Sequence, residues 1–307
     1  MCRFERLLGF LLVAGVGCAE IPPVPTSPAS AEAPGAASAM PRYHIQFEDL
    51  PQPYASEDAV NPPTVMQQPA DVSLTLPPRF SIEAFATGFE RPRWMALAPN
   101  GDVFVSDAKA GSVVILRDAD RDGVAETRFT FAENLMQPFG LAFHDASLYV
   151  GCTNAVLRFP YRAGQTAAES EGTKIADLPG RGYREHWTRN VVFSPDGKTM
   201  FVSIGSESNV APEDDPMRAA IAAFNPDGSG KRIFASGLRN PIGLAFHPAT
   251  GKLWAAVQER DRLGDDLVPD YITEVREGGF YGWPYAYLGP HEDPRRKGER
   301  PDLVEKT

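Results

Sequence analysis

Short apolar segments alternate with tight turns through most of the chain after residue 78. Each unit consists of an apolar run, a turn that contains Gly, Asp or Asn, and a second apolar run. Four such units occur, at residues 91–106, 137–151, 190–203 and 240–256. Corresponding positions in the four units are Ala98, Phe143, Phe193 and Phe246. The pattern predicts four copies of one unit built from short strands and tight turns.

Repeats of roughly 40 to 50 residues made of short strands are typical of the blades of a β-propeller. A blade buries both faces against its neighbours, which explains strands that are continuously apolar. The strands are too short and too close together for βαβ units, and no amphipathic helical stretch of useful length is present. An eight-stranded sandwich is the alternative, but it leaves the polar cluster at the start of each unit unexplained. We therefore predict an all-β propeller, in which that cluster faces the central channel.

Four units and a partial fifth, from Tyr271 to Tyr287, fill residues 78–307, and the sequence after Gly289 is polar. A propeller ring needs closure, because otherwise its first and last blades expose their edges. We expect residues 78–307 to form a propeller domain that is truncated at its C-terminus and lacks its last blade or two. A complete five-bladed ring is the alternative.

The first 18 residues have the features of an export signal. Arg3 and Arg6 precede an apolar run, residues 7–17, that is too short to span a bilayer. The run ends in Gly-Val-Gly before Cys18, which resembles the lipobox of bacterial lipoproteins and implies lipidation of Cys18. We expect an exported protein, either a periplasmic or a cell-surface lipoprotein. An ordinary signal peptide, or cleavage elsewhere among the small residues, is the alternative.

Residues 19–77 have the composition of a linker and an N-terminal extension. The part up to residue 41 is rich in Pro, Ala and Ser, so it cannot bury enough apolar surface to offset its ordering entropy. Residues 42–77 contain several prolines and predict no regular element. We interpret residues 19–41 as a flexible tether between Cys18 and the folded domain, and residues 42–77 as an irregular N-terminal extension.

The chain has 307 residues and a formal net charge of −10, with 43% hydrophobic and 23% charged residues. This composition is that of a globular protein. The acidic balance argues against nucleic acid and anionic membrane surfaces as partners, which leaves a lipid anchor as the expected membrane contact. Cys152 is the one cysteine in the body of the chain, so neither a disulfide framework nor a four-cysteine zinc site can form. The five histidines are scattered, which argues against a histidine-rich zinc site.

Five motifs, in order along about residues 78–290, resemble those of the glucose/sorbosone dehydrogenase family. These motifs are Gln137–Phe143, His186–Asn190, Gly237–Pro241, Gln258–Asp261 and Gly278–Pro284. The resemblance implies a six-bladed propeller that uses pyrroloquinoline quinone (PQQ) and calcium to oxidise an aldose or a sugar-derived aldehyde. Because the chain has no C-x-x-C-H cytochrome motif, the electron acceptor would be a separate molecule.

The resemblance assigns the base. A histidine at the position of His186 takes the substrate's hydroxyl proton in the family, and imidazole suits that role because its pKa lies near neutral. Glu185 aligns with an acidic neighbour and is expected to tune the site. The alternative is a structural histidine, hydrogen-bonded at a blade entrance. Arg189 is expected to pair with Glu185 or with another acid.

The resemblance also assigns contacts with the cofactor. Arg239 would lie against the quinone carbonyl that gains charge, where a fixed cation stabilises it. Asn240 and Gln137 are placed at the cofactor too. The alternative for Arg239 is a salt bridge between blades. PQQ carries three carboxylates, and the last blades, which supply Lys and Arg in the family, are the ones we expect this chain to lack.

Backbone carbonyls after a glutamine hold the cofactor's calcium in the family. The candidate ligands here lie in one acidic loop: Gln258, Glu259, Arg260, Asp265 and Asp266. Glu259 and Arg260 stand where the soluble glucose enzymes have Gly and Pro. The family's active-site aspartate falls on Asp270 when counted back from the Gly278 motif, with Asp265 and Asp266 as alternatives.

A second candidate for calcium has the spacing D-x-D-x-D-G of a calcium loop. Its candidate ligands are Asp118, Asp120, Asp122 and Glu126, and Gly123 stands at the sharp turn. Phe129 occupies position twelve, where a bidentate glutamate is usual. A solvated hairpin turn is the alternative to a structural calcium site.

Two other function classes stay open. A non-catalytic propeller that binds carbohydrate or protein is the main alternative to a dehydrogenase, and the altered calcium loop favours it. A calcium-dependent lactonase-type propeller would need side-chain ligands that converge on the channel, for which Asn154, Asn190 and Asn240 are available.

Overall fold

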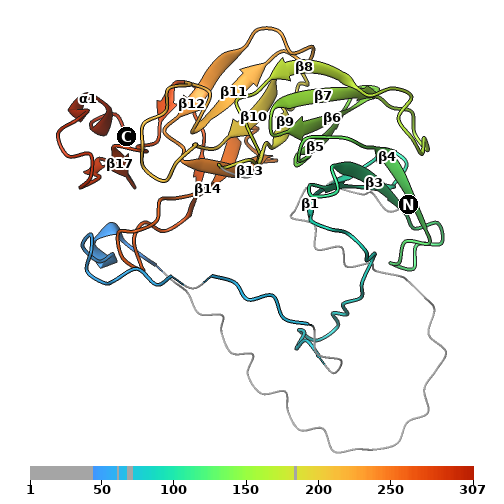
Figure 1. The fold of residues 1–307 in the computed structure, drawn as a ribbon, viewed down its shortest axis with the longest axis horizontal. Helices are drawn as coiled ribbons and strands as arrows, with labels where there is room; N and C mark the ends of the chain where they lie inside the picture. The colour runs from blue at the N-terminus through green and yellow to red at the C-terminus, as the bar shows by residue number, and fades with distance from the viewer. Residues whose placement is uncertain (1–43, 61, 68–71, 183–184) are drawn as a thin grey trace, which may run out of the picture.

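The computed structural model describes residues 44–60, 62–67, 72–182 and 185–307 (Figure 1). The expected export signal and Cys18 lie outside the described residues. No helix in the described part of the chain is long and apolar enough to cross a membrane. Helical structure there is limited to the 3-10 turn η1 (Phe47–Asp49) and the short helix α1 (Pro301–Val304).

Four twisted antiparallel sheets follow one another along the chain as propeller blades, which confirms the predicted fold class. The first blade contains β1 (Pro92–Leu97), β2 (Val103–Asp107), β3 (Ser112–Arg117) and β4 (Thr127–Ala132). The second contains β5 (Leu141–His144), β6 (Ser147–Cys152), β7 (Ala155–Pro160) and β8 (Thr173–Asp177). The third contains β9 (Val191–Phe193), β10 (Met200–Ile204), β11 (Ala220–Phe224) and β12 (Arg232–Ser236). The fourth contains β13 (Asn240–Phe246), β14 (Leu253–Gln258) and β15 (Tyr271–Glu274).

The repeated aromatic position has a packing reason. Phe143 lies edge-on to Phe104 of the preceding blade, with ring centroids 5.0 Å apart. Phe246 packs in the same way on Phe201, at 5.7 Å. At the corresponding position, Phe193 lies edge-on to a tyrosine of the second blade. Each ring thus fills the space between two sheets, and such pairs add to the free energy of burial.

The middle strands of the third blade show why the apolar runs are continuous. Every residue of β10 and of β11 is buried, because both faces of this sheet are covered by the neighbouring blades. A strand with two buried faces has no polar side, so the sequence shows no alternation.

Hydrogen bonds join successive blades near the starts of their first strands. Ser106 Oγ donates to the Phe139 carbonyl oxygen over 2.7 Å, which links the first two blades. Asn190 Nδ2 donates to the Ile242 carbonyl oxygen over 3.1 Å, which links the last two. The strands β1, β5, β9 and β13 contact one another in sequence, and the blades form an arc (Figure 1). We call the region around the starts of these four strands the hub.

The expectation of a partial fifth blade is wrong. Strand β15 pairs with β14 and is the third strand of the fourth blade. Strand β16 (Gly279–Phe280) instead pairs in parallel with β12 of the third blade. The remaining pair, β17 (Ala286–Tyr287) and β18 (His291–Glu292), forms its own two-stranded sheet. Tyr281 Oη donates to the Glu274 carbonyl oxygen, so this region closes over the fourth blade without adding a new one.

Residues 47–59, which we call the N-terminal strap, pack against the end of the fourth blade (Figure 1, blue beside orange). The Phe47 ring stacks on His291. The Tyr54 amide donates to the Leu263 carbonyl oxygen over 2.7 Å. Asp58 accepts a hydrogen bond from the Gly264 amide at 2.9 Å. The described residues of the extension thus form no strand, and part of them is bound to the loop that follows β14.

Candidate functional site

The hub brings together residues from four loops of the third and fourth blades. His186 lies in the loop before β9, and Arg239 lies directly before β13. The loop after β10 contributes residues 205–209, and the loop after β14 contributes Gln258 and the residues that follow it. The first two loops lead into the inner strands of adjacent blades, which is why residues 53 positions apart, at 186 and 239, approach each other.

The imidazole of His186 is held by Ser206. Its Nδ1 lies 3.0 Å from the Ser206 carbonyl oxygen and 2.9 Å from Ser206 Oγ. A carbonyl oxygen can only accept, and the hydroxyl donates its own proton to the Ser208 carbonyl oxygen at 2.6 Å. Both groups that face Nδ1 are therefore acceptors, so Nδ1 carries the proton and Nε2 carries the lone pair. The His186 ring is thereby oriented to accept a proton at Nε2.

Burial keeps His186 neutral. Loss of solvent, together with the positive charge of Arg239, lowers the pKa of His186 to about 4. Hydrogen bonding to Ser206 opposes the shift only in part. At neutral pH the ring is therefore an uncharged base beside a cation.

Arg239 is 5% exposed and is held by a set of main-chain and side-chain acceptors. Its Nη1 donates to the Glu259 carbonyl oxygen at 2.5 Å, and its Nε and Nη2 donate to Asn209 O and Oδ1 at 3.2 and 2.9 Å. Its carboxylate partner, Asp261 at 3.2 Å, has a side chain that is 76% exposed. Solvent screens that partner, so the buried end of the guanidinium keeps much of its positive potential.

Asn240 completes the centre of the hub. Its Nδ2 donates to Gln258 Oε1 at 3.0 Å, while its buried Oδ1 has no hydrogen-bond partner among the described residues. A side chain on Gly205 would place its Cβ 2.4 Å from that Oδ1 and 2.5 Å from the His186 Cβ. Asn240 and His186 therefore meet over Gly205, where any larger residue would push them apart.

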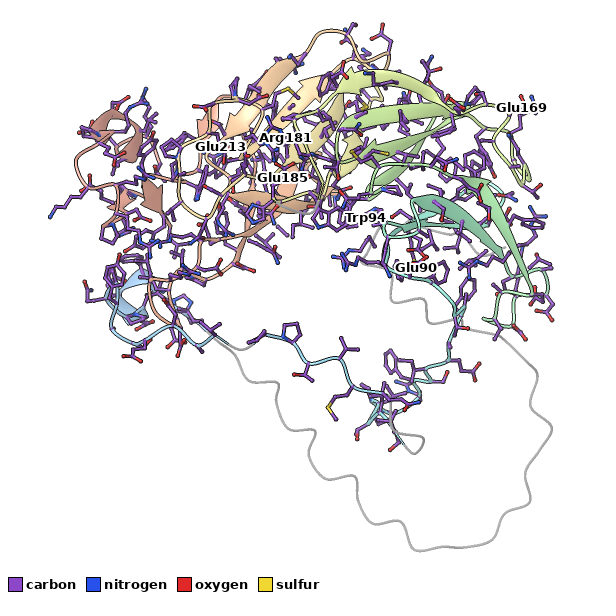
Figure 2. All side chains as sticks on the ribbon, in the orientation of Figure 1. Glu90, Trp94, Glu169, Arg181, Glu185 and Glu213 are labelled. Carbon is purple, nitrogen blue, oxygen red and sulfur yellow. The ribbon has the colours of Figure 1, made fainter. Side chains whose placement is uncertain are left out.

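Glu185 does not face the imidazole. Its carboxylate forms an ion pair with Arg218, and both side chains are almost completely buried. Its Oε1 also accepts a hydrogen bond from the Arg181 amide at 2.6 Å, and Figure 2 shows Glu185 beside Arg181. The geometry gives Glu185 a part in holding the loop before β9.

Arg189 holds the same loop from the other side. It is fully buried, and its guanidinium donates to the carbonyl oxygens of His186, Thr188 and Pro179. No acid pairs with it among the described residues, so the expected pairing with Glu185 is wrong. Burial, together with the charge of Arg218, lowers the pKa of Arg189 to about 9. The cation therefore serves as a multiple donor to the backbone that carries the imidazole.

Gln137 lies at the edge of this group. Its Oε1 accepts a hydrogen bond from Thr153 at 3.0 Å, and the same hydroxyl lies 3.0 Å from the Trp187 carbonyl oxygen. The residue adopts a positive φ of 49° at the start of the second blade. The structure thus places Gln137 next to the loop of His186, and Thr153 bridges the two.

The carbonyls expected to bind calcium are already occupied by a cation. Arg239 Nη1 lies 2.5 Å from the Glu259 carbonyl oxygen and 3.5 Å from that of Gln258. The Arg260 side chain turns away and pairs with the buried Asp293 at 2.8 Å. A second cation at the same oxygens would be repelled by the guanidinium, so these residues do not fit calcium in this arrangement.

The carboxylates expected beside that calcium are also dispersed. Asp270 accepts a hydrogen bond from the Glu259 amide at 2.9 Å. Asp265 binds the Ala59 amide of the N-terminal strap at 2.6 Å, and Asp266 is exposed. Burial raises the pKa of the Glu259 carboxyl to about 7. The loop therefore offers no converging set of carboxylates.

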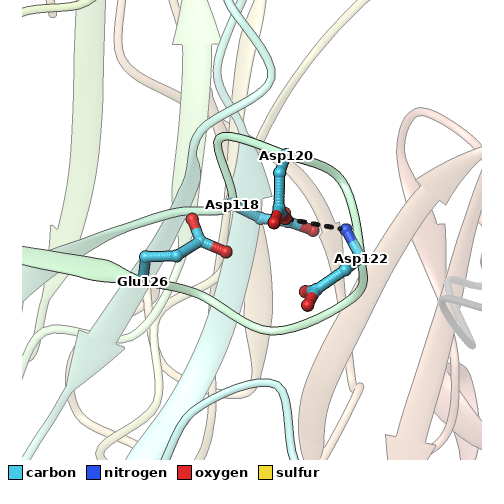
Figure 3. Close-up of side chains that lie close together, drawn as sticks. All are labelled: Asp118, Asp120, Asp122 and Glu126. Atoms are coloured by element: carbon cyan, nitrogen blue, oxygen red, sulfur yellow. Dashed lines mark hydrogen bonds between the residues drawn. The ribbon is translucent and has the colours of Figure 1, made fainter.

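In the second expected calcium loop, the four acidic side chains lie close together. Carboxylate oxygens of Asp118, Asp120, Asp122 and Glu126 lie within 4.8 Å of one another on the exposed turn between β3 and β4 (Figure 3). Each acid also accepts a main-chain amide, as Asp120 does from Asp122 at 3.2 Å. Such bonds are those of a tight turn, and calcium binding by this loop stays a prediction.

Sequence analysis missed Ser206 and Asn209. Both lie in the loop after β10, within Gly205-Ser206-Glu207-Ser208-Asn209. The available signal was this polar run, which directly follows the second strand of a unit. The candidate site residues were instead taken from the polar runs that precede the first strands.

Comparisons with known proteins agree with the fold and with the resemblance seen in the motifs. A model of the TrAA12-like family matches residues 74–273. An uncharacterized protein of Borreliella burgdorferi is 24% identical over 238 residues, which cover 73% of this chain and 60% of that protein. The pyrroloquinoline quinone-dependent sugar dehydrogenase of Hypocrea jecorina is 25% identical over 235 residues, covering 66% of this chain and 54% of that protein.

Among solved structures, the iodide structure of the Trichoderma reesei protein of Carbohydrate-Active Enzymes Family AA12 superposes with a TM-score of 0.59. It is 21% identical and covers 70% of this chain and 61% of that one. This likeness shows the shared propeller fold. The chain thus spans roughly 60% of the length of the proteins it matches.

Proposed function

The chain belongs to the TrAA12-like family, and from that premise we propose that it is a PQQ-dependent dehydrogenase that oxidises an aldose or a sugar-derived aldehyde. One observation carries the proposal: a neutral imidazole, His186, and a buried guanidinium, Arg239, lie together at the hub. The printed name of the Hypocrea jecorina relative supports the same class of reaction.

His186 has the properties that a base in this reaction needs. Its Nδ1–H is tied to Ser206, so Nε2 is the atom that takes the substrate's hydroxyl proton. A ring that is uncharged at neutral pH is always ready for that transfer, although its low pKa limits the driving force. After the transfer, the imidazolium would lie beside Arg239 and lose its proton readily to solvent.

Arg239 would bind the electron-rich part of the cofactor. When bound, the quinone supplies the hydride acceptor. The guanidinium is buried, fixed by Asn209, and screened only by the exposed Asp261, which fits a quinone oxygen or a carboxylate as its partner. The unpartnered Oδ1 of Asn240 fits an N–H or O–H donor of the cofactor or the sugar. No step is assigned to calcium, because the carbonyls proposed for it hold Arg239.

Dye reduction tests the proposal. The purified protein is incubated with PQQ, with and without calcium, and assayed with a panel of aldoses and their aldehydes. Activity that requires PQQ and falls by about 10²-fold or more in His186→Ala supports it. His44→Ala, which changes an exposed histidine ahead of the strap, is the matched control and should behave like the parent. A His186→Ala variant as active as the parent would contradict the assigned role.

A non-catalytic binding module is the second candidate, and one observation favours it. The oxygen ligands that the cofactor's calcium would use are hydrogen-bonded to Arg239. Calorimetry with PQQ distinguishes the two, because a binding module for carbohydrate or protein would show no heat of binding at micromolar PQQ.

A further inference from the structure

The loop that follows β10 contacts both central residues of the hub. The contacts come from its first residues, Gly205 to Asn209, which directly follow a strand that is buried along its whole length. Only two residues thus separate Ser206, which holds His186, from Asn209, which holds the guanidinium of Arg239. Because β10 lies in the middle of its sheet, between β9 and β11, this loop starts from a rigid base.

We infer that Ser206 and Asn209 are positioning residues that fix the imidazole of His186 relative to the guanidinium of Arg239. The inference deepens the proposed function and rests on it, since it says how the base and the cation keep their geometry. We call residues 205–209 the bracket.

Ser206 ties the two residues directly. Its amide donates to the Arg239 carbonyl oxygen at 2.8 Å. Its carbonyl oxygen accepts from the His186 amide at 3.3 Å and from Nδ1 at 3.0 Å, and its hydroxyl accepts from Nδ1 at 2.9 Å. Its hydroxyl proton is directed to Ser208 O. One residue therefore binds the backbone of the cation and sets the tautomer of the base.

Asn209 orients the guanidinium. Its carbonyl oxygen accepts from Arg239 Nε at 3.2 Å and from Trp283 Nε1 at 2.9 Å. Its Oδ1 accepts from Arg239 Nη2 and from the Asp261 amide, both at 2.9 Å, and its Nδ2 donates to the Asp261 carbonyl oxygen at 3.0 Å. The amide cannot flip, because Oδ1 faces two donors and Nδ2 faces an acceptor. Two nitrogens of the guanidinium are thus fixed in one plane.

These contacts predict that changes in the bracket alter the pKa of His186 and the value of kcat, which a loop that only stabilises the fold would not do. If the bracket loosens, the guanidinium moves while the imidazole stays buried, so the electrostatic effect of Arg239 on His186 weakens. The catalytic geometry degrades as well, and positioning errors of this kind lower kcat more than they raise KM.

The test uses Asn209→Ala, the milder Asn209→Ser, and Ser206→Ala. Ser229→Ala is the matched control, because this exposed serine lies outside the bracket and its hydroxyl bonds Asn225 and Asp227 on the turn between β11 and β12. Nitrogen-15 NMR of histidine-labelled protein, without PQQ, reports the pKa and the tautomer of His186. Circular dichroism and thermal unfolding establish that each variant is folded.

We expect both Asn209 variants to raise the His186 pKa toward its ordinary value, and Ser206→Ala to draw the Nδ1 and Nε2 resonances together as the tautomers mix. Ser229→Ala should match the parent. With PQQ and sugar, we expect kcat to fall about 10-fold to 100-fold at nearly constant KM. Folded Asn209 and Ser206 variants with parental His186 resonances would overturn the inference. Shifted resonances in a protein that reduces no dye would instead refute the proposed function and leave the bracket intact.

Discussion

Arg239 donates a hydrogen bond to the main-chain oxygen of Glu259 over 2.5 Å, so a cation of the protein lies where the sequence led us to expect calcium. The carbonyl oxygen of Gln258, at 3.5 Å, faces the same nitrogen. Guanidinium and calcium would therefore compete for one pair of oxygens, and that competition can be measured.

Arg239→Met should bind calcium more tightly than the parent protein. The change frees both carbonyl oxygens and removes a positive charge beside Asp261, so we expect a gain of about tenfold or more in affinity. Isothermal calorimetry with calcium alone measures it. Arg276→Met removes an equal charge from an exposed position and should leave calcium binding unchanged. Equal affinities in the parent and in Arg239→Met would show that the two cations do not share these oxygens.

Glu259→Gln should stabilise the protein more at pH 8 than at pH 5. Burial raises the pKa of Glu259 from 4.5 to about 7, so the stability that its carboxyl contributes is fully present below about pH 4.5 and is lost as the pH rises through 7. Glutamine cannot ionise, and it can still accept from the Arg260 amide. We expect the difference in unfolding free energy between variant and parent to grow by on the order of 2 kcal/mol across this range. His186 titrates in both proteins, so its contribution cancels in the comparison. A difference that does not change with pH would contradict the buried-acid assignment.

Removing one partner of the Glu185–Arg218 pair should destabilise the fold strongly. Both side chains are buried, so Glu185→Gln leaves Arg218 as an uncompensated charge and should cost about 3–5 kcal/mol in urea unfolding. The double variant Glu185→Leu, Arg218→Met should recover most of that loss, because no charge is left buried. A loss below about 1 kcal/mol in the single variant would mean that solvent reaches the pair.

The N-terminal strap should contribute to the stability of the fourth blade. Removal of residues 1–60 exposes the cluster of Leu263, Leu267 and Tyr287, whereas removal of residues 1–43 leaves every described contact of the strap intact. We expect the longer deletion to lower the Tm by about 4 °C or more relative to the shorter one. Phe47→Ala, which removes the ring that packs on His291, should cost about 1–2 kcal/mol. Equal melting temperatures for the two deletions would show that the strap does not hold this region.

The blades could be predicted from the sequence because each strand's burial determines its own residue pattern. A strand buried on both faces must be apolar throughout, and the phenylalanines at 143, 193 and 246 recur because each fills the same gap between sheets. The same reasoning predicted that His186 and Arg239 lie at equivalent places in neighbouring units. It failed for Tyr271, whose strand completes the fourth blade, because a third strand and the first strand of a new unit have similar composition.

The contacts that the sequence did not predict link residues without a common pattern. Asn209 and Asp261 come from different blades, and no sequence pattern in either segment predicts that they form a hydrogen bond. The strap binds Asp265, which is 206 positions further along the chain, through the main-chain amide of Ala59. Every residue except proline has such an amide, so composition does not predict this contact. Arg189 was expected to pair with an acid, but its two terminal nitrogens donate to carbonyl oxygens, and any residue can supply those.

The pH dependence of kcat/KM for an oxidised aldose, measured with PQQ between about pH 3.5 and 8, tests the central claim most directly. The claim is that a neutral, buried His186 receives the proton, so activity requires the unprotonated ring. Because burial and Arg239 lower the pKa of His186 to about 4, kcat/KM should stay constant from pH 8 to about 5 and fall with a midpoint near 4. A midpoint near 6.5, the ordinary value for histidine, would contradict the account, as would a profile that His186→Gln leaves unchanged.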